Sequence, residues 1–454
     1  MKKSSGAESF PLGSPSTSCG QKCFEWLISP QTTESFIANI WEKKPIVIRR
    51  DRDDYHSGII TRRTIENFIK NDQEFAANSI LLSRGAGDEK ETYAESVLDA
   101  ESLCKMVNEE GWICQVVHPQ QKSAKVHALL ERLENWSGSL WGSNYFFGSA
   151  ATNPADAMSD NVELFVMQLE GKSHWKVFEG ETKLSRDAGC EFQEEDLGPS
   201  IIDEELEAGD LIYIPRGYIY SSTGLTSFAH LSLSTYQTQS WCDMLSTALT
   251  DTLDKITRSN LKFREGLPIN WLNLFGKSIE ETETNKSNRD SFRSNMKDLL
   301  DTLIDSIDID DVADQIASDF VALRTPPVAR KRPNEEESKT FGPDPRKSND
   351  LQIRIRNPSW MRIVVEDEEE GKLLIFSCLD NDVSQHMKTD NPLEAEPTSL
   401  EIVGTKSLEG LKQLVREWPN YCPIDIVSRD VLGELWEHGL IETAEDSSKK
   451  PRTI

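Results

Sequence analysis

The strongest constraint on the fold is a run of short apolar segments between about Val116 and Gln237, separated by turn-forming residues. The clearest segments are SNYFFGSA, VELFVMQLEG, SHWKVFEG, GDLIYIPRGYIYSS and FAHLSLSTYQ. Several short strands at this spacing are typical of an antiparallel sandwich or barrel. Gly171 and Gly217 fall at predicted turns, where glycine tolerates a positive φ. This part of the chain is therefore predicted to form a β-sandwich or barrel.

Helical patterns flank this region. The first twenty residues have two lysines but no apolar stretch after them, so we expect a disordered tail and not a signal peptide. After the β region, apolar residues from Met244 to Ile256 recur at helical spacing, and an acidic helical pattern continues to about Leu323. The stripe of residues 244–256 is expected to serve as core or as a dimer contact.

The C-terminal part begins with a Pro-rich, charged stretch from Pro326 to Asp350, which is typical of a linker. Its basic motif ARKRP, Ala329 to Pro333, is either a nuclear localisation signal or a chance cluster of basic residues. From Leu351 to Glu445, short strands precede two amphipathic helices, which suits a winged-helix type module.

The charge balance limits the class of partner. Net charge is −27 at neutral pH, so most of the surface repels phosphate backbones and direct DNA binding is disfavoured. The negative net charge favours a basic protein as partner, although the excess of acidic residues also keeps the protein soluble. The eight cysteines are scattered, which favours reduced thiols in the cytosol or nucleus. No apolar run of about 18 residues is present, so no membrane span is expected.

Several motifs together carry a resemblance to a known family. FEWLISP…WEKKPIVIRR, GSNYFF, ELFVMQLEGKSHWKVF, GDLIYIPRGYIY and HLSLSTYQTQSWCDML occur in this order, and the resemblance runs from about Cys23 to Glu445. This chain resembles the JmjC-type ribosomal oxygenases, described as bifunctional lysine-specific demethylases and ribosomal-protein histidyl hydroxylases. The resemblance implies an α+β fold with a cupin-like double-stranded β-helix, or jelly roll. It also implies a helical dimerisation region and a winged-helix-like C-terminal domain.

The resemblance divides the chain into six parts. These are a disordered tail (1–22), the JmjC jelly roll with N-terminal helices (23–240), the helical dimerisation region (241–325), a linker (326–350), the winged-helix-like domain (351–445) and a C-terminal tail (446–454).

The family's chemistry implies Fe(II) and 2-oxoglutarate, with the iron held by two His and one carboxylate. Carried onto this sequence, the first His of the family's His-x-Asp pair falls on Met158 and the Asp falls on Asp160. The distal His position is Tyr220, in PRGYIY. Only the carboxylate ligand is therefore retained.

The co-substrate positions also depart from the family. The Lys expected to anchor 2-oxoglutarate falls on Ser173, with Lys172 displaced by one residue. The expected Tyr falls on Phe146, with Tyr145 displaced by one, whereas a co-substrate-side hydroxyl is kept as Ser234. A one-residue shift on a strand turns a side chain to the opposite face. Neither displaced residue is therefore expected to replace its neighbour unless a bulge intervenes.

Two alternatives stay open from the residues. A different alignment would let His118, His174 or His230 supply ligands, although a structural role is favoured for each. Asp156 and Asp160 together would offer carboxylates to another divalent ion, although two acids in a loop are more often simply solvated.

We therefore expect a ribosomal-oxygenase homologue with a degenerate metal site, acting as a non-catalytic protein-interaction module. Its expected partner is a basic ribosomal protein or histone, its expected state a homodimer, and its location the nucleus or nucleolus. The alternative is an active Fe(II)/2-oxoglutarate dioxygenase that acts as a histone lysine demethylase, a ribosomal-protein histidyl hydroxylase, or both.

Overall fold

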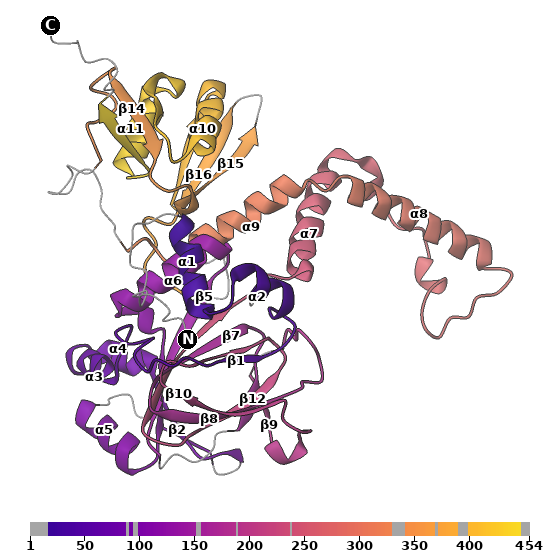
Figure 1. Cartoon of the computed structure of the whole chain (residues 1–454). Helices are drawn as coiled ribbons and strands as arrows, with labels where there is room; N and C mark the ends of the chain where they lie inside the picture. Colours follow the sequence, from indigo (N-terminus) through magenta and orange to yellow (C-terminus); the bar gives the residue numbers. More distant parts are fainter. Residues whose placement is uncertain are drawn as a thin grey trace, which may run out of the picture. The chain divides into compact units, whose positions relative to one another are not determined.

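The computed structural model describes residues 17–87, 90–93, 99–150, 156–187, 189–236, 238–328, 341–367, 371–388 and 398–445. The chain divides into two compact units (Figure 1). The first comprises the residues up to 237 together with those from 320 onward, and the second runs from Thr238 to Asp319. No helix among the described residues is long and apolar enough to cross a membrane.

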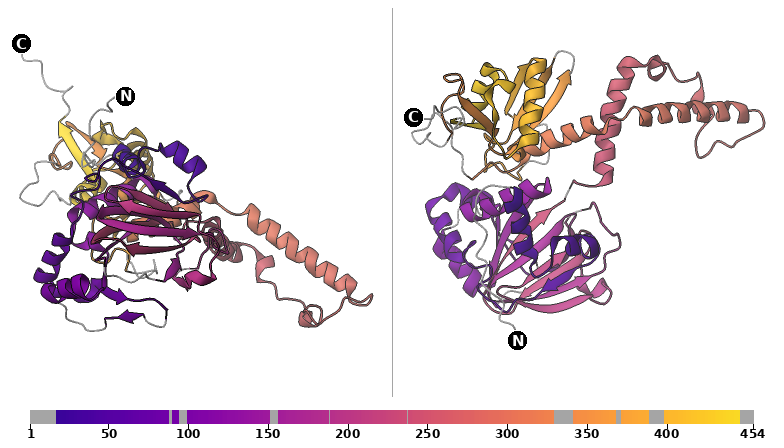
Figure 2. Two further views of the ribbon diagram at one scale, coloured as in Figure 1. Left: turned by 60° about the horizontal axis from the view of Figure 1, so that its bottom comes forward. Right: turned by 45° about the horizontal axis from the view of Figure 1, so that its top comes forward.

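Two antiparallel sheets form the centre of the first unit (Figures 1 and 2). Among the described residues, the larger sheet has the order β1-β11-β7-β13-β5-β4-β2-β3 and the smaller β10-β8-β12-β6-β9. The larger sheet contains β1 (Ile46–Ile48), β2 (Ile80–Arg84), β3 (Glu91–Thr92), β4 (Ile113–Val117), β5 (Trp141–Gly148), β7 (Glu163–Glu170), β11 (Leu211–Ile214) and β13 (Phe228–Thr235). The smaller contains β6 (Ala157–Ser159), β8 (Lys172–Phe178), β9 (Cys190–Phe192), β10 (Ile202–Glu207) and β12 (Ile219–Gly224). The predicted α+β jelly roll is confirmed.

Side-chain alternation along the strands creates two apolar layers. The outer face of the larger sheet packs in one cluster with the N-terminal helices. These helices are α1 (Thr17–Ile28), α2 (Thr33–Asn39), α3 (Arg62–Asn71), α4 (Gln73–Ser79), α5 (Ala100–Glu109) and α6 (Ala124–Ser137). The inner layer lies between the two sheets and includes Leu164 and Val166 of β7 with Trp175 and Val177 of β8.

Glycines fix two of the tight turns, as the sequence predicts. Gly171 has φ 64° between β7 and β8, and a Cβ there would lie 1.9 Å from the carbonyl oxygen of Ser227. Gly217 has φ 86° before β12, and its Cβ would lie 2.5 Å from the carbonyl oxygen of Thr182. Any other residue would need the backbone to move at both places.

The C-terminal domain combines two small sheets with two helices around its own core. One sheet contains β14 (Leu351–Ile355), β18 (Cys422–Pro423) and β19 (Ile441–Glu445). The other contains β15 (Met361–Asp367), β16 (Lys372–Ser377) and β17 (Thr398–Val403). The helices are α10 (Thr405–Glu417) and α11 (Arg429–Glu437), the second capped by Ser428.

The second unit is helical. Its main helices are α7 (Trp241–Ser259), α8 (Lys286–Asp305) and the start of α9 (Ile309–Leu323). On α7, Ile256 is buried, but Leu245, Leu249 and Leu253 are 50%, 40% and 45% exposed. One end of the predicted apolar stripe is therefore core, whereas its three leucines are exposed in a single chain.

Two predicted boundaries need correction. Helix α1 begins at Thr17, inside the predicted tail of residues 1–22. Residues 341–350 of the predicted linker belong to the C-terminal domain, because Phe341 is buried and its carbonyl accepts the Thr443 amide at 2.9 Å. Phe341 supplies the apolar anchor that composition alone obscured. The motif ARKRP lies outside the described residues.

Candidate functional site

The three positions that the resemblance assigns to metal ligands lie together. Strand β6 pairs with β12 so that Met158 is directly opposite Tyr220. The Tyr220 hydroxyl donates a hydrogen bond of 2.6 Å to Oδ2 of Asp160. The Asp160 carbonyl accepts the Gly217 amide at 3.0 Å, which fixes the loop after β6 against the PRG turn. The fold therefore brings Met158, Asp160 and Tyr220 together at one end of β6 and β12.

Tyr220 is held as a neutral phenol. Burial raises its pKa well above the usual value near 10, and the adjacent Asp160 carboxylate raises it further. Both effects disfavour the phenolate, since it would be a second negative charge in a poorly solvated place. The hydroxyl proton is therefore available to Asp160, and the carboxylate has a permanent donor within the protein.

Aromatic rings fill the inner space beside this trio. Trp175 stacks on Tyr220 with ring centroids 6.1 Å apart and meets His230 edge-on at 5.4 Å. His230 in turn stacks on Phe146 at 4.9 Å and on Phe228 at 5.9 Å. The rings form a continuous chain from β8 across to β13 and β5. Such offset and edge-on contacts stabilise an apolar interior.

His230 is a neutral member of this ring chain. Burial lowers its pKa to about 3, so it carries no charge at neutral pH. Within the described part of the chain, its Nδ1 has no hydrogen-bond partner. The ring therefore packs as an aromatic group, in agreement with the structural role favoured from the sequence.

The co-substrate positions occupy the faces expected from strand alternation. Ser173 is buried on the inner face of β8, whereas Lys172 lies on the outer face and pairs with Glu207. Phe146 is on the inner face of β5, whereas Tyr145 belongs to the outer cluster under the helices. Neither displaced residue replaces its neighbour, and the described residues give the Ser173 hydroxyl no partner.

Ser234 faces inward on β13, directly opposite Gly142 of β5. A Cβ built on Gly142 would lie 3.0 Å from the Ser234 hydroxyl oxygen. The absence of a side chain at residue 142 therefore leaves room for this hydroxyl at the end of the strand pair.

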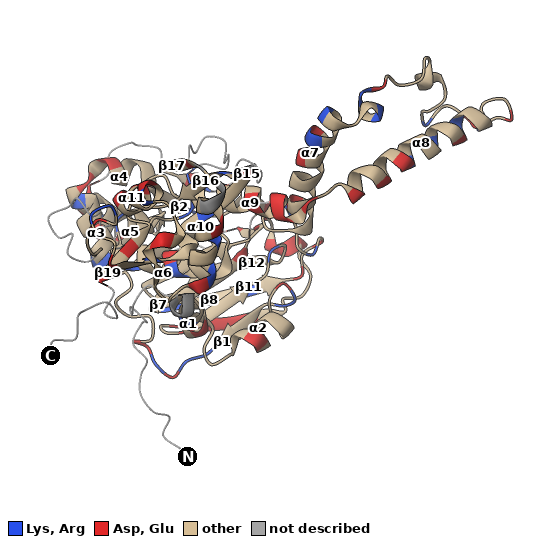
Figure 3. Ribbon diagram, turned by 90° about the horizontal axis from the view of Figure 1, so that it is seen from above, with Lys and Arg blue, Asp and Glu red and all other residues tan. Residues whose placement is uncertain are grey.

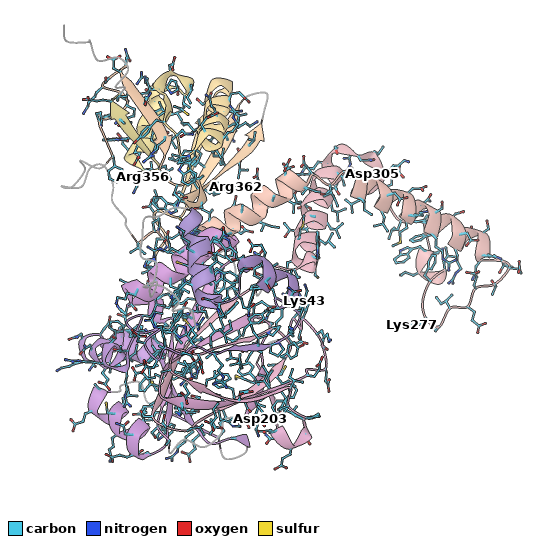
Figure 4. All side chains as sticks on the ribbon, viewed as in Figure 1. Lys43, Asp203, Lys277, Asp305, Arg356 and Arg362 are labelled. Carbon is cyan, nitrogen blue, oxygen red and sulfur yellow. The ribbon has the colours of Figure 1, made fainter. Side chains whose placement is uncertain are left out.

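The other candidate ligands lie elsewhere. His174 is on the outer face of β8, where its Nε2 is 2.6 Å from Oδ1 of Asp203, a residue that Figure 4 labels. His118 precedes the 3-10 helix η2 (Pro119–Gln121) with a left-handed backbone. The Asp156 carboxylate accepts a hydrogen bond from the Gly87 amide at 2.8 Å, which gives this side chain a structural role.

A buried acid near the Asp160 loop was not anticipated from the sequence. Glu163 at the start of β7 is fully buried and accepts a hydrogen bond from the Tyr213 hydroxyl. Arg216 lies 3.7 Å from it and also pairs with Glu42. Burial raises the pKa of Glu163 to about 7 despite these partners. A lone Glu within the apolar VELFV segment was the signal that could have revealed it.

The fold and this inner site define a JmjC-type jelly-roll protein. The JmjC domain model matches residues 115–244. Along 442 residues the chain is 28% identical to ribosomal oxygenase 1 of Danio rerio, covering 93% of this chain and 80% of that protein. It is 29% identical over 442 residues to the bifunctional lysine-specific demethylase and histidyl-hydroxylase NO66 of Aedes aegypti, covering 93% and 67%.

Among solved structures, E. coli ycfD has the same fold, with a TM-score of 0.51 at 13% identity over 91% of this chain and 98% of that one. The chain therefore contains a JmjC domain over residues 115–244 and is similar to ribosomal oxygenases along most of its length.

The residues at the ligand positions do not fit Fe(II). A thioether and a protonated phenol are poor partners for non-haem iron, which prefers imidazole and carboxylate. Of the three residues, Asp160 alone carries a suitable metal ligand, and its Oδ2 already accepts a hydrogen bond from the Tyr220 hydroxyl. Nowhere in the described ranges do three His, Cys, Asp or Glu side chains come close enough to hold a metal ion.

Proposed function

We propose that this chain is a ribosomal-oxygenase homologue that has lost the family's iron chemistry and acts as a protein-interaction module. The hydrogen bond from Tyr220 to Asp160 carries the proposal. In it, a phenol proton occupies the carboxylate that would otherwise bind the metal. Met158, opposite Tyr220, offers only a soft, neutral sulfur.

The co-substrate side supports the same proposal. A cation anchoring the far carboxylate of 2-oxoglutarate contributes a charge-assisted hydrogen bond of about 1.5–3 kcal/mol. Ser173 at that position has no charge, and the aromatic chain through Phe146 and His230 is apolar and neutral. The losses therefore affect both the metal and its co-substrate.

The proposed partner is a basic nuclear or ribosomal protein, such as a histone or a ribosomal protein. Acidic residues outnumber basic ones by 77 to 50, which favours association with cationic chains. Figure 3 shows acidic positions along α8, where Asp298, Asp301 and Asp305 are exposed. A nuclear location follows from such a partner.

Residues 241–325 are proposed as the homodimer contact. On α7, Leu245, Leu249 and Leu253 form an exposed stripe one helical turn apart. Scattered apolar side chains are normal on a surface, but a continuous helical stripe favours burial by another chain.

The alternative function is that of an active dioxygenase. The similarity to a protein named as a lysine-specific demethylase and histidyl-hydroxylase, over 93% of this chain, favours it. It requires Fe(II) to be held by a donor set other than two His and a carboxylate.

Anaerobic titration with Fe(II) and 2-oxoglutarate separates the two. We expect no metal-to-ligand absorption band and no succinate after oxygen is admitted. The matched variant combines Met158→His, Tyr220→His and Ser173→Lys, and is expected to gain the band. A native protein that gives the band and produces succinate would refute the loss of activity.

A further inference from the structure

Helix α8 of the second unit packs against its own unit along one side. Near its start, the Phe292 ring lies 5.7 Å from that of Trp271 and 4.9 Å from that of Phe275, both from the segment that precedes the helix (Figure 2). Near its end, Leu303 is only 7% exposed. These residues define the side of α8 that is covered within a single chain.

An apolar stripe lies beside that covered side. Met296, Leu300 and Ile304 are 54%, 45% and 58% exposed. Residues four apart share one face of a helix, so the three side chains form a continuous stripe. Single exposed apolar residues are common on surfaces, but a stripe of three large ones along a helix is typical of a contact with another helix.

Two arrangements of a second α8 would cover the whole stripe. In a parallel pair, each of the three residues meets its own counterpart. In an antiparallel pair, Leu300 lies at a two-fold axis and meets itself, whereas Met296 meets Ile304 of the partner subunit. The charges beside the stripe distinguish the two arrangements.

Lys297 and Asp301 lie on the same flank of the stripe, because they are four residues apart. Both are exposed, and neither forms an ion pair within the part of the chain that the structure describes. In an antiparallel pair, the two-fold axis brings this flank beside the same flank of the second copy. Lys297 of each copy then lies beside Asp301 of the other. In a parallel pair, the flank would instead meet the one that carries Leu299 and Leu303, and no opposite charges would meet.

The end of α8 also favours an antiparallel neighbour. Its last turn has Asp305, labelled in Figure 4, and no basic residue. A helix C-terminus is stabilised by cations and destabilised by anions. In the antiparallel pair, this turn lies beside Arg293 and Lys297 of the partner subunit. The second copy then supplies the cations that the last turn lacks.

We propose that α8 packs antiparallel against the α8 of a second copy, about a two-fold axis at Leu300, with Lys297 of each copy beside Asp301 of the other. The proposal rests on the homodimer proposed above and adds the helix face, the direction and the charges that select the partner. The flank is complementary to itself in this direction alone, which favours a second copy over a helix of different charge pattern.

Disulfide formation in the full-length protein reports the direction of the pair. The background variant replaces the exposed Cys190 and Cys242 with Ser and should give no covalent dimer. Leu300→Cys should give a covalent dimer under mild oxidation. Met296→Cys alone should not, because its two copies would lie about 12 Å apart along the helix axis, beyond the reach of a disulfide. An equimolar mixture of Met296→Cys and Ile304→Cys should form the covalent dimer again.

The variants Lys297→Glu and Asp301→Lys isolate the charge contact. Each homodimer of a single variant brings like charges together, whereas the mixed dimer brings opposite charges together at both contacts. The charges within each helix are the same in both kinds of dimer, so their effect cancels. With one variant isotopically labelled, native mass spectrometry should show the mixed dimer at least about tenfold above either homodimer, whereas random association gives about twofold.

A covalent dimer from Met296→Cys alone, or random association of the charge variants, would overturn the antiparallel contact even if the native mass is dimeric. A monomeric native mass would overturn the homodimer proposed above together with this contact. The two failures are therefore distinguishable. The charge variants alter exposed residues and need no oxidation, so they decide alone if a cysteine variant does not fold.

Discussion

The buried carboxylate of Glu134 gives the sharpest test of how the jelly roll and C-terminal domain are joined. Its Oε1 accepts from the Trp141 amide at 3.2 Å and from His386 Nε2 at 2.8 Å. Its Oε2 accepts from the Thr325 amide at 2.9 Å and from the Thr325 hydroxyl at 2.5 Å. Burial alone would raise the pKa of Glu134, but His386, Arg324 and the Thr325 hydroxyl outweigh it and lower that pKa. All four donors therefore meet an ionised acceptor.

Glu134→Gln keeps the size of the side chain and removes one acceptor atom. Whichever way the amide turns, its NH₂ group faces two N–H or O–H donors. Each buried donor left without an acceptor costs about 1–3 kcal/mol, so the variant should lose about 2–5 kcal/mol. Glu131→Gln is the matched control, since Glu131 is also buried but, among the described residues, accepts only from the Asn135 amide at 2.7 Å. A Gln oxygen preserves that bond, and its cost should stay under about 0.5 kcal/mol.

The assay is native-state hydrogen exchange of the Thr325 amide, together with urea unfolding of each variant. A loss of 2 kcal/mol corresponds to exchange about thirtyfold faster, because 1.4 kcal/mol is about a factor of ten. If the free energies of unfolding of Glu134→Gln and Glu131→Gln differ by less than about 0.5 kcal/mol, the conclusion that Glu134 accepts four hydrogen bonds is wrong.

Three further predictions concern the inner site and the dimer. Because the folded state raises the pKa of Glu163 from 4.5 to about 7, stability should fall as pH rises through that range, by up to about 3 kcal/mol. Glu163→Gln should flatten this loss in thermal unfolding from pH 5 to 8, and an unchanged slope would contradict it. Tyr220→Phe, which deprives Asp160 of its donor, should cost about 1–2 kcal/mol in urea unfolding, and no loss would contradict the hydrogen bond. Light scattering at micromolar concentration should give a dimeric mass that Leu249→Glu reduces to that of a monomer; a monomeric native protein would exclude the contact.

The local sequence pattern was sufficient to predict much of the fold. The short strands of residues 116–237 and the turn glycines Gly171 and Gly217 lie where the sequence predicts them. The opposite faces of Lys172 and Ser173 followed from the period of two along a strand, and no bulge moves them. These features depend on neighbours a few residues away, so the sequence contains their causes directly.

Boundaries were less predictable. Residues 341–350 have the composition of a linker, yet Phe341 packs into the C-terminal domain and its carbonyl bonds Thr443. A single buried ring can order a polar segment, and composition averaged over the segment hides it.

The residue types at the site came from the sequence, and their interactions came only from the fold. The sequence placed Met158, Asp160 and Tyr220 at the ligand positions, and the structure adds that Tyr220 donates to Asp160 and joins an aromatic chain. Glu134 and His386 are separated by 252 residues, yet they share a buried hydrogen bond. Periodicity reports which way a side chain points from its own backbone, but the partner that it meets depends on how distant segments pack. That packing alone decides which buried acids have hydrogen-bond partners.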